Sequence, residues 1–183
     1  MTSTAAVVLA AGSGSRYRGS THKLLAPFRG RIVVGHAVDA AVAAGLDETV
    51  VVVGAVDLDV PPGVRVVRNE RWAEGLATSL RAGVDAARGH DAVVVGLGDQ
   101  PLVTPEAWRL VAAASTTPLA VATYDGVRGH PVRLAASVWD RLPRSGDEGA
   151  RSLLRSGAAE VTEVRCPGSP ADVDTVEDLT AWS

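Results

Sequence analysis

Residues 5–16 are Ala5-Ala6-Val7-Val8-Leu9-Ala10-Ala11-Gly12-Ser13-Gly14-Ser15-Arg16, and they are the clearest indication of the fold class. Its first five residues are apolar without alternation, which is typical of a strand buried on both faces. The glycines and serines that come next predict a tight turn at the carboxyl end of that strand. A doubly covered strand that leads into a glycine-rich turn indicates an α/β protein with a parallel sheet.

The rest of the chain repeats this alternation of apolar strands and alanine-rich helices. Strands are expected over 49–53, 64–67, 91–97, 118–123, 132–134 and 161–165. Helices are expected over 36–44, 76–87, 105–114, 136–142 and 148–154 and after Thr175. Thr104 and Thr175 are expected N-caps, and Gly45 is an expected helix terminator. The order predicts a three-layer α/β/α, Rossmann-like fold with a mostly parallel central sheet, and residues 1–183 form one expected domain.

Composition excludes several classes of protein. The chain has 183 residues, of which 46% are hydrophobic and 21% charged, and no apolar stretch reaches the roughly 18 residues of a membrane helix. The N-terminus lacks the basic start of a signal peptide, and Cys166 has no internal disulfide partner, so a soluble, cytoplasmic protein is expected. A net charge of -3 and 4% aromatic residues offer nucleic acid neither a basic surface nor stacking platforms. Neither nucleic acid nor a membrane is an expected partner.

The glycine-rich turn is followed by two cations, Arg16 and Lys23. Small residues let backbone N–H groups approach a polyphosphate closely, and the guanidinium and ammonium groups would neutralise its charge. The segment is not a P-loop, because Lys23 follows histidine and precedes leucine, and residues 12–17 do not complete the dinucleotide pattern. The alternative is an ordinary turn of small residues, but the two cations favour an anion-binding loop.

Carboxylates stand at two other places where ligands are expected. Asp99 ends the apolar run 93–97 in a Gly-Asp-Gln-Pro turn, and Asp172 and Asp174 precede the last helix. Mg²⁺ prefers a few carboxylate oxygens together with phosphate oxygens and water, so these aspartates are candidate ligands of a nucleotide-bound Mg²⁺. The alternative is structural. Asp99 would be a helix-side cap, and Asp172 and Asp174 would favour the positive end of the dipole of a helix that Thr175 caps.

The loop and the acidic turn together resemble a known family. Residues 9–23 are similar to the Leu-Ala-Ala-Gly-x-x-x-Arg…Lys signature that MobA-like nucleotidyltransferases of the molybdenum-cofactor type share with sugar-phosphate nucleotidyltransferases. Residues 98–103 resemble the metal-binding motif of the same family. Segments 69–79, 129–131 and 146–151 look like pieces that occur together in molybdenum cofactor cytidylyltransferases. The resemblance implies a Mg²⁺-dependent transfer of a nucleoside monophosphate from a triphosphate to a phosphorylated acceptor, with release of pyrophosphate.

The resemblance also implies roles for individual residues. The implied nucleotide-binding residues are Leu9, Ala10, Ala11, Gly12, Ser13, Gly14, Arg16, Lys23, Ser79 and Asp99. The implied catalytic residues are Arg16, Lys23 and Asp99, and the implied metal ligands are Asp99, Asp172 and Asp174. The implied acceptor-facing residues are His130, Asp147 and Arg151. From the residues alone, Asp147 is an expected N-cap of helix 148–154, with Arg151 as its salt-bridge partner, and His130 a satisfied polar group.

The substrates rest on resemblance alone. Alanine at position 11 implies CTP as donor, since guanosine-specific members have glycine there, and the implied acceptor is the pterin phosphate of the molybdenum cofactor. A molybdoenzyme or its chaperone would then be a partner. The loop between Arg16 and Lys23 is longer than usual in this branch, which leaves open its path and any role of Arg18 or His22. Two rivals are a sugar 1-phosphate acceptor and a non-catalytic nucleotide-binding or cofactor-binding chaperone.

Overall fold

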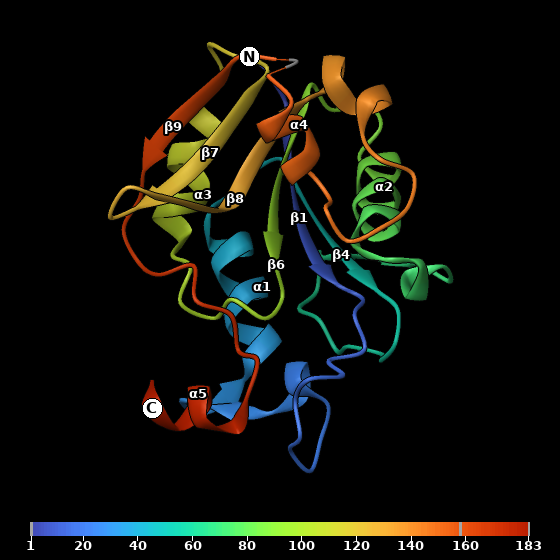
Figure 1. Ribbon diagram of the computed structural model, residues 1–183, viewed down its shortest axis with the longest axis vertical. Coiled ribbons are helices and arrows are strands. Elements are labelled where there is room, and N and C mark those ends of the chain that lie inside the picture. The colour runs from blue at the N-terminus through green and yellow to red at the C-terminus, as the bar shows by residue number, and fades with distance from the viewer. Residues whose placement is uncertain (1, 158, 183) are drawn as a thin grey trace.

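The computed structural model describes residues 2–157 and 159–182, which build a seven-stranded sheet with helices on both faces (Figure 1). Its strands are β1 (Thr4–Ala10), β4 (Glu48–Val53), β5 (Arg65–Arg68), β6 (Ala92–Leu97), β7 (Leu119–Tyr124), β8 (Val127–Ala135) and β9 (Val161–Arg165). They lie in the order β5-β4-β1-β6-β8-β7-β9, and within the described residues β8 alone runs against the others. The expected mostly parallel sheet is confirmed.

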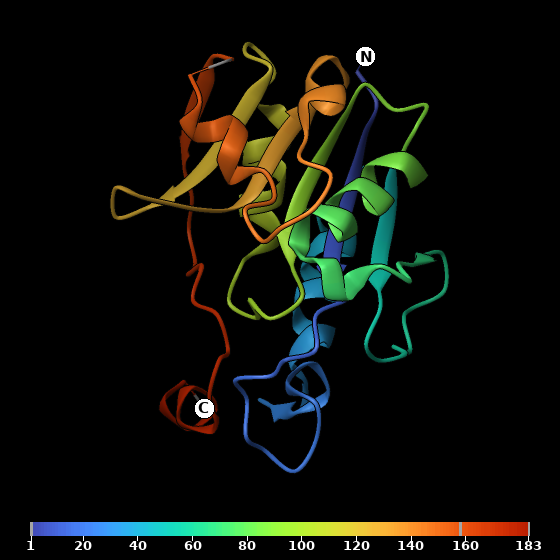
Figure 2. The same ribbon diagram turned by 45° about the vertical axis from the view of Figure 1, so that its right-hand side comes forward.

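The helices form the two outer layers. The helices are α1 (Val33–Ala43), α2 (Leu76–Ala86), α3 (Pro105–Ala113), α4 (Arg151–Arg155) and α5 (Val176–Ala181). Helices α1 and α3 pack on one face, whereas α2 and α4 pack on the other (Figure 2). Helix α5 instead packs beside the small hairpin of β2 (Pro27–Phe28) and β3 (Arg31–Ile32), beyond the carboxyl ends of the central strands. Short 3-10 helices are η1 (Lys23–Leu25), η2 (Trp72–Glu74) and η3 (Ala136–Arg141).

Strand β1 is the centre of the core. All seven of its residues are buried, and it pairs in parallel with β4 and with β6, so that Val7 lies opposite Val50 and Val95. Val8 packs in the apolar cluster beneath α1 and α3, while Val7 packs in the cluster beneath α2. Complete burial of one valine side chain contributes about 1.5–3 kcal/mol. The carboxyl end of β1, and with it the start of the glycine-rich loop, is therefore held firmly in the sheet.

The expected helix boundaries at three positions are confirmed by hydrogen bonds. Thr104 Oγ1 accepts a hydrogen bond from the Ala107 N–H at 3.2 Å. Thr175 and Asp178 form a reciprocal capping box at the start of α5. Gly45 follows α1 with a φ of 68°, a left-handed conformation that glycine adopts without steric cost, and its N–H donates to the Val42 carbonyl.

The second half of the sheet differs from expectation. Strand β8 is nine residues long, whereas the expected strand covers only 132–134. It forms an antiparallel hairpin with β7, and the register of this pairing shifts between Val121 and Ala122. The segment expected as helix 136–142 is the 3-10 helix η3, and the helix expected over 148–154 begins at Arg151. Residue 150, and not Asp147, precedes this helix as its N-cap, so the capping role expected of Asp147 is wrong. Within the described ranges no helix has the length and apolarity needed to cross a bilayer.

Two helical glycines offer a test of the packing between the helices and the sheet. A methyl group on Gly83 of α2 would lie 2.5 Å from Val7 Cγ1, whereas one on Gly35 of α1 would meet the flexible Arg31 guanidinium at 3.2 Å. Alanine is intrinsically better than glycine in a helix by about 1 kcal/mol. We expect Gly83→Ala to lower the free energy of unfolding by about 1–3 kcal/mol, because overpacking against β1 outweighs that gain.

Gly35→Ala is the matched control, and it should raise the free energy of unfolding by up to about 1 kcal/mol. Urea denaturation followed by circular dichroism measures both. Equal effects of the two substitutions would contradict the close approach of α2 to β1.

Candidate active site

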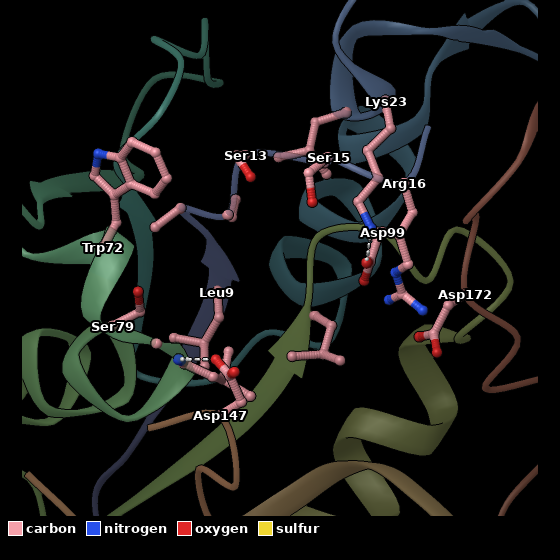
Figure 3. A pocket seen from close by; sticks show the side chains of 18 of the residues that line it. Leu9, Ser13, Ser15, Arg16, Lys23, Trp72, Ser79, Asp99, Asp147 and Asp172 are labelled. Atoms are coloured by element: carbon pink, nitrogen blue, oxygen red, sulfur yellow. Dashed lines mark hydrogen bonds and ion pairs between the residues drawn. The ribbon is translucent and has the colours of Figure 1, made fainter. Parts of the chain in front are cut away.

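A cleft of about 710 Å³ opens at the carboxyl ends of β1 and β6 (Figure 3). All ten residues implied to bind the nucleotide line this cleft. Three further predicted residues, Asp147, Arg151 and Asp172, also line it. Asp174 contacts its charged residues, whereas His130 lines a neighbouring cavity. The fold thus brings together residues from distant parts of the chain.

The loop after β1 is held by a histidine. His22 Nδ1 accepts a hydrogen bond from the Leu24 N–H at 3.3 Å, so its Nε2 carries the proton in the neutral ring. That Nε2 donates to the Gly12 carbonyl at 3.0 Å and ties the two ends of the loop together. His22 therefore stabilises the loop conformation through both of its ring nitrogens, whereas Arg18 is exposed. Sequence reasoning missed this contact because it depends on the path of the loop.

Four charged side chains form one network at one end of the cleft. Lys23 Nζ lies 2.6 Å from Asp99 Oδ2 and 3.5 Å from Asp174 Oδ1. Arg16 Nη1 lies 3.1 Å from Asp174 Oδ2. The Lys23 and Asp99 side chains are only 12% and 20% exposed, so water screens their attraction less than that of a surface pair. The network links the loop, the end of β6 and the segment before α5.

A third carboxylate, that of Asp172, faces the same space. Gln100 Nε2 donates to Asp172 Oδ1 at 2.7 Å and to the Pro170 carbonyl at 2.9 Å, which orients the carboxylate. Burial raises the pKa of Asp172, and the negative charge of Asp99 raises it further. A cation beside these two acids would relieve their repulsion. Sequence reasoning did not single out Gln100, which is visible only as part of the Gly-Asp-Gln-Pro turn.

The acidic residues suit a metal that a nucleotide brings with it. Among the described residues there is no group of three or more His, Cys, Asp or Glu side chains placed to hold an ion. Mg²⁺ usually takes one or two protein carboxylates and completes its shell with phosphate oxygens and water. Asp99 and its acidic neighbours fit that requirement.

The other end of the cleft is less polar. Trp72, Leu76 and Leu9 contribute apolar walls there, and Figure 3 draws Trp72, Leu9 and Ser79 well apart from Lys23 and Asp99. Asn69 Nδ2 donates to Ser79 Oγ at 3.0 Å, so the hydroxyl proton of Ser79 stays available for another acceptor. Trp72 both packs against the apolar core and lines the cleft.

The Asp147 side chain binds the N-terminus of α2. Its Oδ1 accepts from the Leu76 N–H at 3.4 Å, and the Gly146 carbonyl accepts from the Ala77 N–H at 2.9 Å. In the described part of the chain no ion pair joins Asp147 to Arg151, so the salt bridge expected between them is wrong. The loop that carries Asp147 is thereby fixed to the N-terminus of a helix that borders the cleft.

A second cavity adjoins the cleft, and Arg151 lines both. This cavity, of about 210 Å³, has walls that include His130, Arg151 and Leu154. Burial lowers the pKa of His130 to about 4, and the positive charge of Arg151 acts in the same direction, so the imidazole is neutral near pH 7. Arg151 lines both spaces and is the physical link between them.

Comparisons with known proteins agree with this geometry. Residues 6–162 match the model of the MobA-like NTP transferase domain. The chain is 34% identical to nicotine blue oxidoreductase of Paenarthrobacter nicotinovorans, over 94% of this chain and 93% of that protein. The crystal structure of Rv0371c from Mycobacterium tuberculosis H37Rv superposes with a TM-score of 0.85 at 34% identity, covering 99% of this chain and 97% of that one. A complex of Rv0371C with manganese gives a TM-score of 0.79 at 33% identity, with 99% and 98% covered. The chain therefore belongs to the MobA-like NTP transferase domain family and is a nucleotidyltransferase.

Proposed function

We propose that this protein transfers CMP from CTP to the phosphate of the molybdenum cofactor pterin and releases pyrophosphate. The observation that supports this most is the division of the cleft into a less polar end, with walls of Trp72, Leu76 and Leu9, and an end that holds the charged network of Lys23 and Asp99. A nucleoside triphosphate has the same division, since its base is uncharged and its phosphates are anionic. In this proposal residues 1–183 act as one cytoplasmic nucleotidyltransferase domain.

The reaction needs little more than positioning and charge stabilisation. An oxygen of the acceptor phosphate attacks the α-phosphorus, a new P–O bond forms, and the bond to the β-phosphate breaks with its electron pair leaving on pyrophosphate. Because the attacking phosphate is already ionised near neutral pH, no strong base is required. Lys23, Arg16 and the N–H groups of residues 12–14 would bind the departing pyrophosphate as its charge grows.

The carboxylates have a complementary task. Asp99, together with Asp172 or Asp174, would hold Mg²⁺, which supplies charge neutralisation at the α-phosphate. The crystal structure of Rv0371C with manganese supports a divalent ion at a site of this family. Asp172 and Asp174 lie beyond the residues that match the family model, so their part in the proposal rests on their contacts in this chain.

Nucleobase choice would depend on the apolar end. Ala11 is 3% exposed, lines the cleft and accepts a hydrogen bond through its carbonyl from the Ala55 N–H at 3.0 Å. That bond fixes the backbone that would face the base edge, and the Ala11 methyl limits the space beside it. Ser79, with a free hydroxyl proton, would donate to an acceptor on the base. The limited space beside the Ala11 methyl favours the smaller cytosine over guanine, whereas the Ser79 hydroxyl would serve an acceptor on either base.

The acceptor would enter from the side of Arg151. Its guanidinium lines both cavities and would attract the acceptor phosphate, while the smaller cavity, with a neutral His130, would take an uncharged ring. A polyhydroxylated sugar phosphate is the rival acceptor. The apolar part of that cavity, formed by Val121, Val132 and Leu154, argues against it, although arginines line the same cavity. A carrier that binds the nucleotide without reaction is the non-catalytic rival, and pyrophosphate release separates it from an enzyme.

A redox function is suggested by the name of the Paenarthrobacter nicotinovorans relative. Residues 12–17 do not complete the Gly-x-Gly-x-x-Gly pattern of dinucleotide-binding loops. The charged network of Lys23, Asp99 and Asp174 suits a polyphosphate with a metal, so transfer is the function that we favour. Thermal shifts with the four ribonucleoside triphosphates and with NADH, each with and without Mg²⁺, test this choice, because a ligand of the native state raises the melting temperature.

Asp99 offers the most direct test of the reaction. We expect Asp99→Asn, which is nearly isosteric, to reduce Mg²⁺-dependent pyrophosphate release by about a hundredfold or more, since the metal loses a charged ligand. Circular dichroism should report an unchanged fold. A folded Asp99→Asn protein with full activity would remove Asp99 from the reaction.

Ala11 tests the choice of base. The wild-type protein should prefer CTP over GTP, and Ala11→Gly should reduce that preference by about tenfold, the range expected for one methyl group in a pocket, while activity persists. The measurement is kcat/KM for each triphosphate with the same acceptor. A wild-type preference for GTP, or an unchanged ratio in the variant, would contradict the cytidine assignment.

A further inference from the structure

We infer that the ammonium group of Lys23 occupies the metal-binding carboxylates, and so blocks the metal site until a triphosphate binds. Metal and nucleotide would then bind cooperatively, each weakly without the other. The inference rests on the proposed function, because it takes Asp99 and its neighbours as metal ligands. It adds a second task for Lys23 beyond contact with phosphate.

The contacts of Lys23 carry the inference. Its Nζ bridges Asp99 Oδ2 at 2.6 Å and Asp174 Oδ1 at 3.5 Å, with its side chain 12% exposed. Asp99, together with Asp172 or Asp174, would also hold the metal of the proposed reaction. An ammonium group and a divalent ion cannot share Asp99 Oδ2 without strong repulsion at short range. A metal that arrives alone must first displace Lys23 from a partly buried ion pair.

The side chain of Lys23 is placed to move between two sets of partners. A methyl group on Gly14 would lie 3.0 Å from Lys23 Cγ, so the stem of the lysine runs along the glycine-rich loop itself. The backbone of that loop would hold the phosphates, and the four-carbon stem can swing its ammonium group from Asp99 toward them without backbone motion. Arg16, paired with Asp174 and 78% exposed, is free to follow.

The exchange couples the two ligands. A triphosphate offers Lys23 and Arg16 new anionic partners and thereby frees the carboxylates for the metal. Because coupling between two binding sites is reciprocal, the metal must strengthen nucleotide binding by the same factor. Wild-type protein should therefore bind the complete metal-nucleotide complex in preference to either component.

Lys23 is the only lysine of the sequence, because the other 17 of the 18 Lys and Arg residues are arginines. A single ε-ammonium group can therefore be observed without assignment. Labelling with ¹⁵N-lysine makes its NMR signal a direct report on whether Lys23 is paired with the carboxylates.

The first experiment measures binding of Mn²⁺ alone by electron paramagnetic resonance. We expect Lys23→Met to bind Mn²⁺ at least about tenfold more tightly than wild type, because the competing ammonium is gone. Arg18→Met is the matched control: it removes one charge from the same loop, and among the described residues no ion pair joins Arg18 to Asp99 or Asp174. Its affinity should stay within about twofold of wild type, as screening of an exposed charge predicts. Equal gains in both variants, or none in Lys23→Met, would overturn the inference.

The second experiment uses the wild-type protein and so does not depend on the folding of a variant. Mg²⁺ alone should leave the ¹⁵N-lysine signal unchanged, and α,β-methylene-CTP should shift it. A shift produced by Mg²⁺ alone at the concentration that saturates the complex would overturn the inference but not the proposed function. Failure of α,β-methylene-CTP to bind with or without Mg²⁺ would overturn both.

Discussion

Burial of β1 on both of its faces determines how the other elements are arranged. A strand covered on both sides needs helices above and below it, and parallel neighbours need crossover connections that supply those helices. The carboxyl ends of β1, β4 and β6 consequently meet at one edge of the sheet. The loop after β1 and the acidic turn after β6 are brought to that edge by topology alone, and the cleft lies between them.

The charged end of the cleft is close to balanced without any ligand. Arg16 and Lys23 face the three carboxylates of Asp99, Asp172 and Asp174, so the acids exceed the cations by one charge. The excess falls on Asp172, whose carboxylate is held by the neutral amide of Gln100 and whose pKa is raised. The cations and the carboxylates of the site thus largely neutralise one another, and a metal-bound triphosphate would add charges of both signs.

Much of the fold could be predicted because its signals are local. The bounds of β9 agree with expectation, and the caps at Thr104 and Thr175 depend only on neighbouring residues. The direction of β8 could not be predicted, since a buried antiparallel strand has the same apolar pattern as a parallel one. The candidate site divides in the same way: the loop cations and the strand-end aspartate were predictable, because topology places the residues after a parallel strand at the ligand edge.

The contacts of Asp147 and His22 could not be predicted, because they depend on tertiary structure. The partner of Asp147, the Leu76 N–H, is 71 residues away in sequence. Asp147 is a typical N-cap residue for a helix that begins at residue 148. In the structure, however, its carboxylate accepts a hydrogen bond from the N-terminus of α2, which is distant in sequence. For His22 the reason is related, since the loop conformation sets which carbonyl accepts its proton.

The segment after β9 separates the architecture of the protein from the charge balance of its cleft. Every strand of the described sheet ends at or before Arg165, whereas Asp172, Asp174 and α5 come later in the sequence. A chain that ended after Arg165 would keep all of these strands and lose two of the three carboxylates at the charged end of the cleft. Lys23 would then keep Asp99 as its partner among these acids. The charges that face a substrate can therefore change while the sheet that supports them is kept.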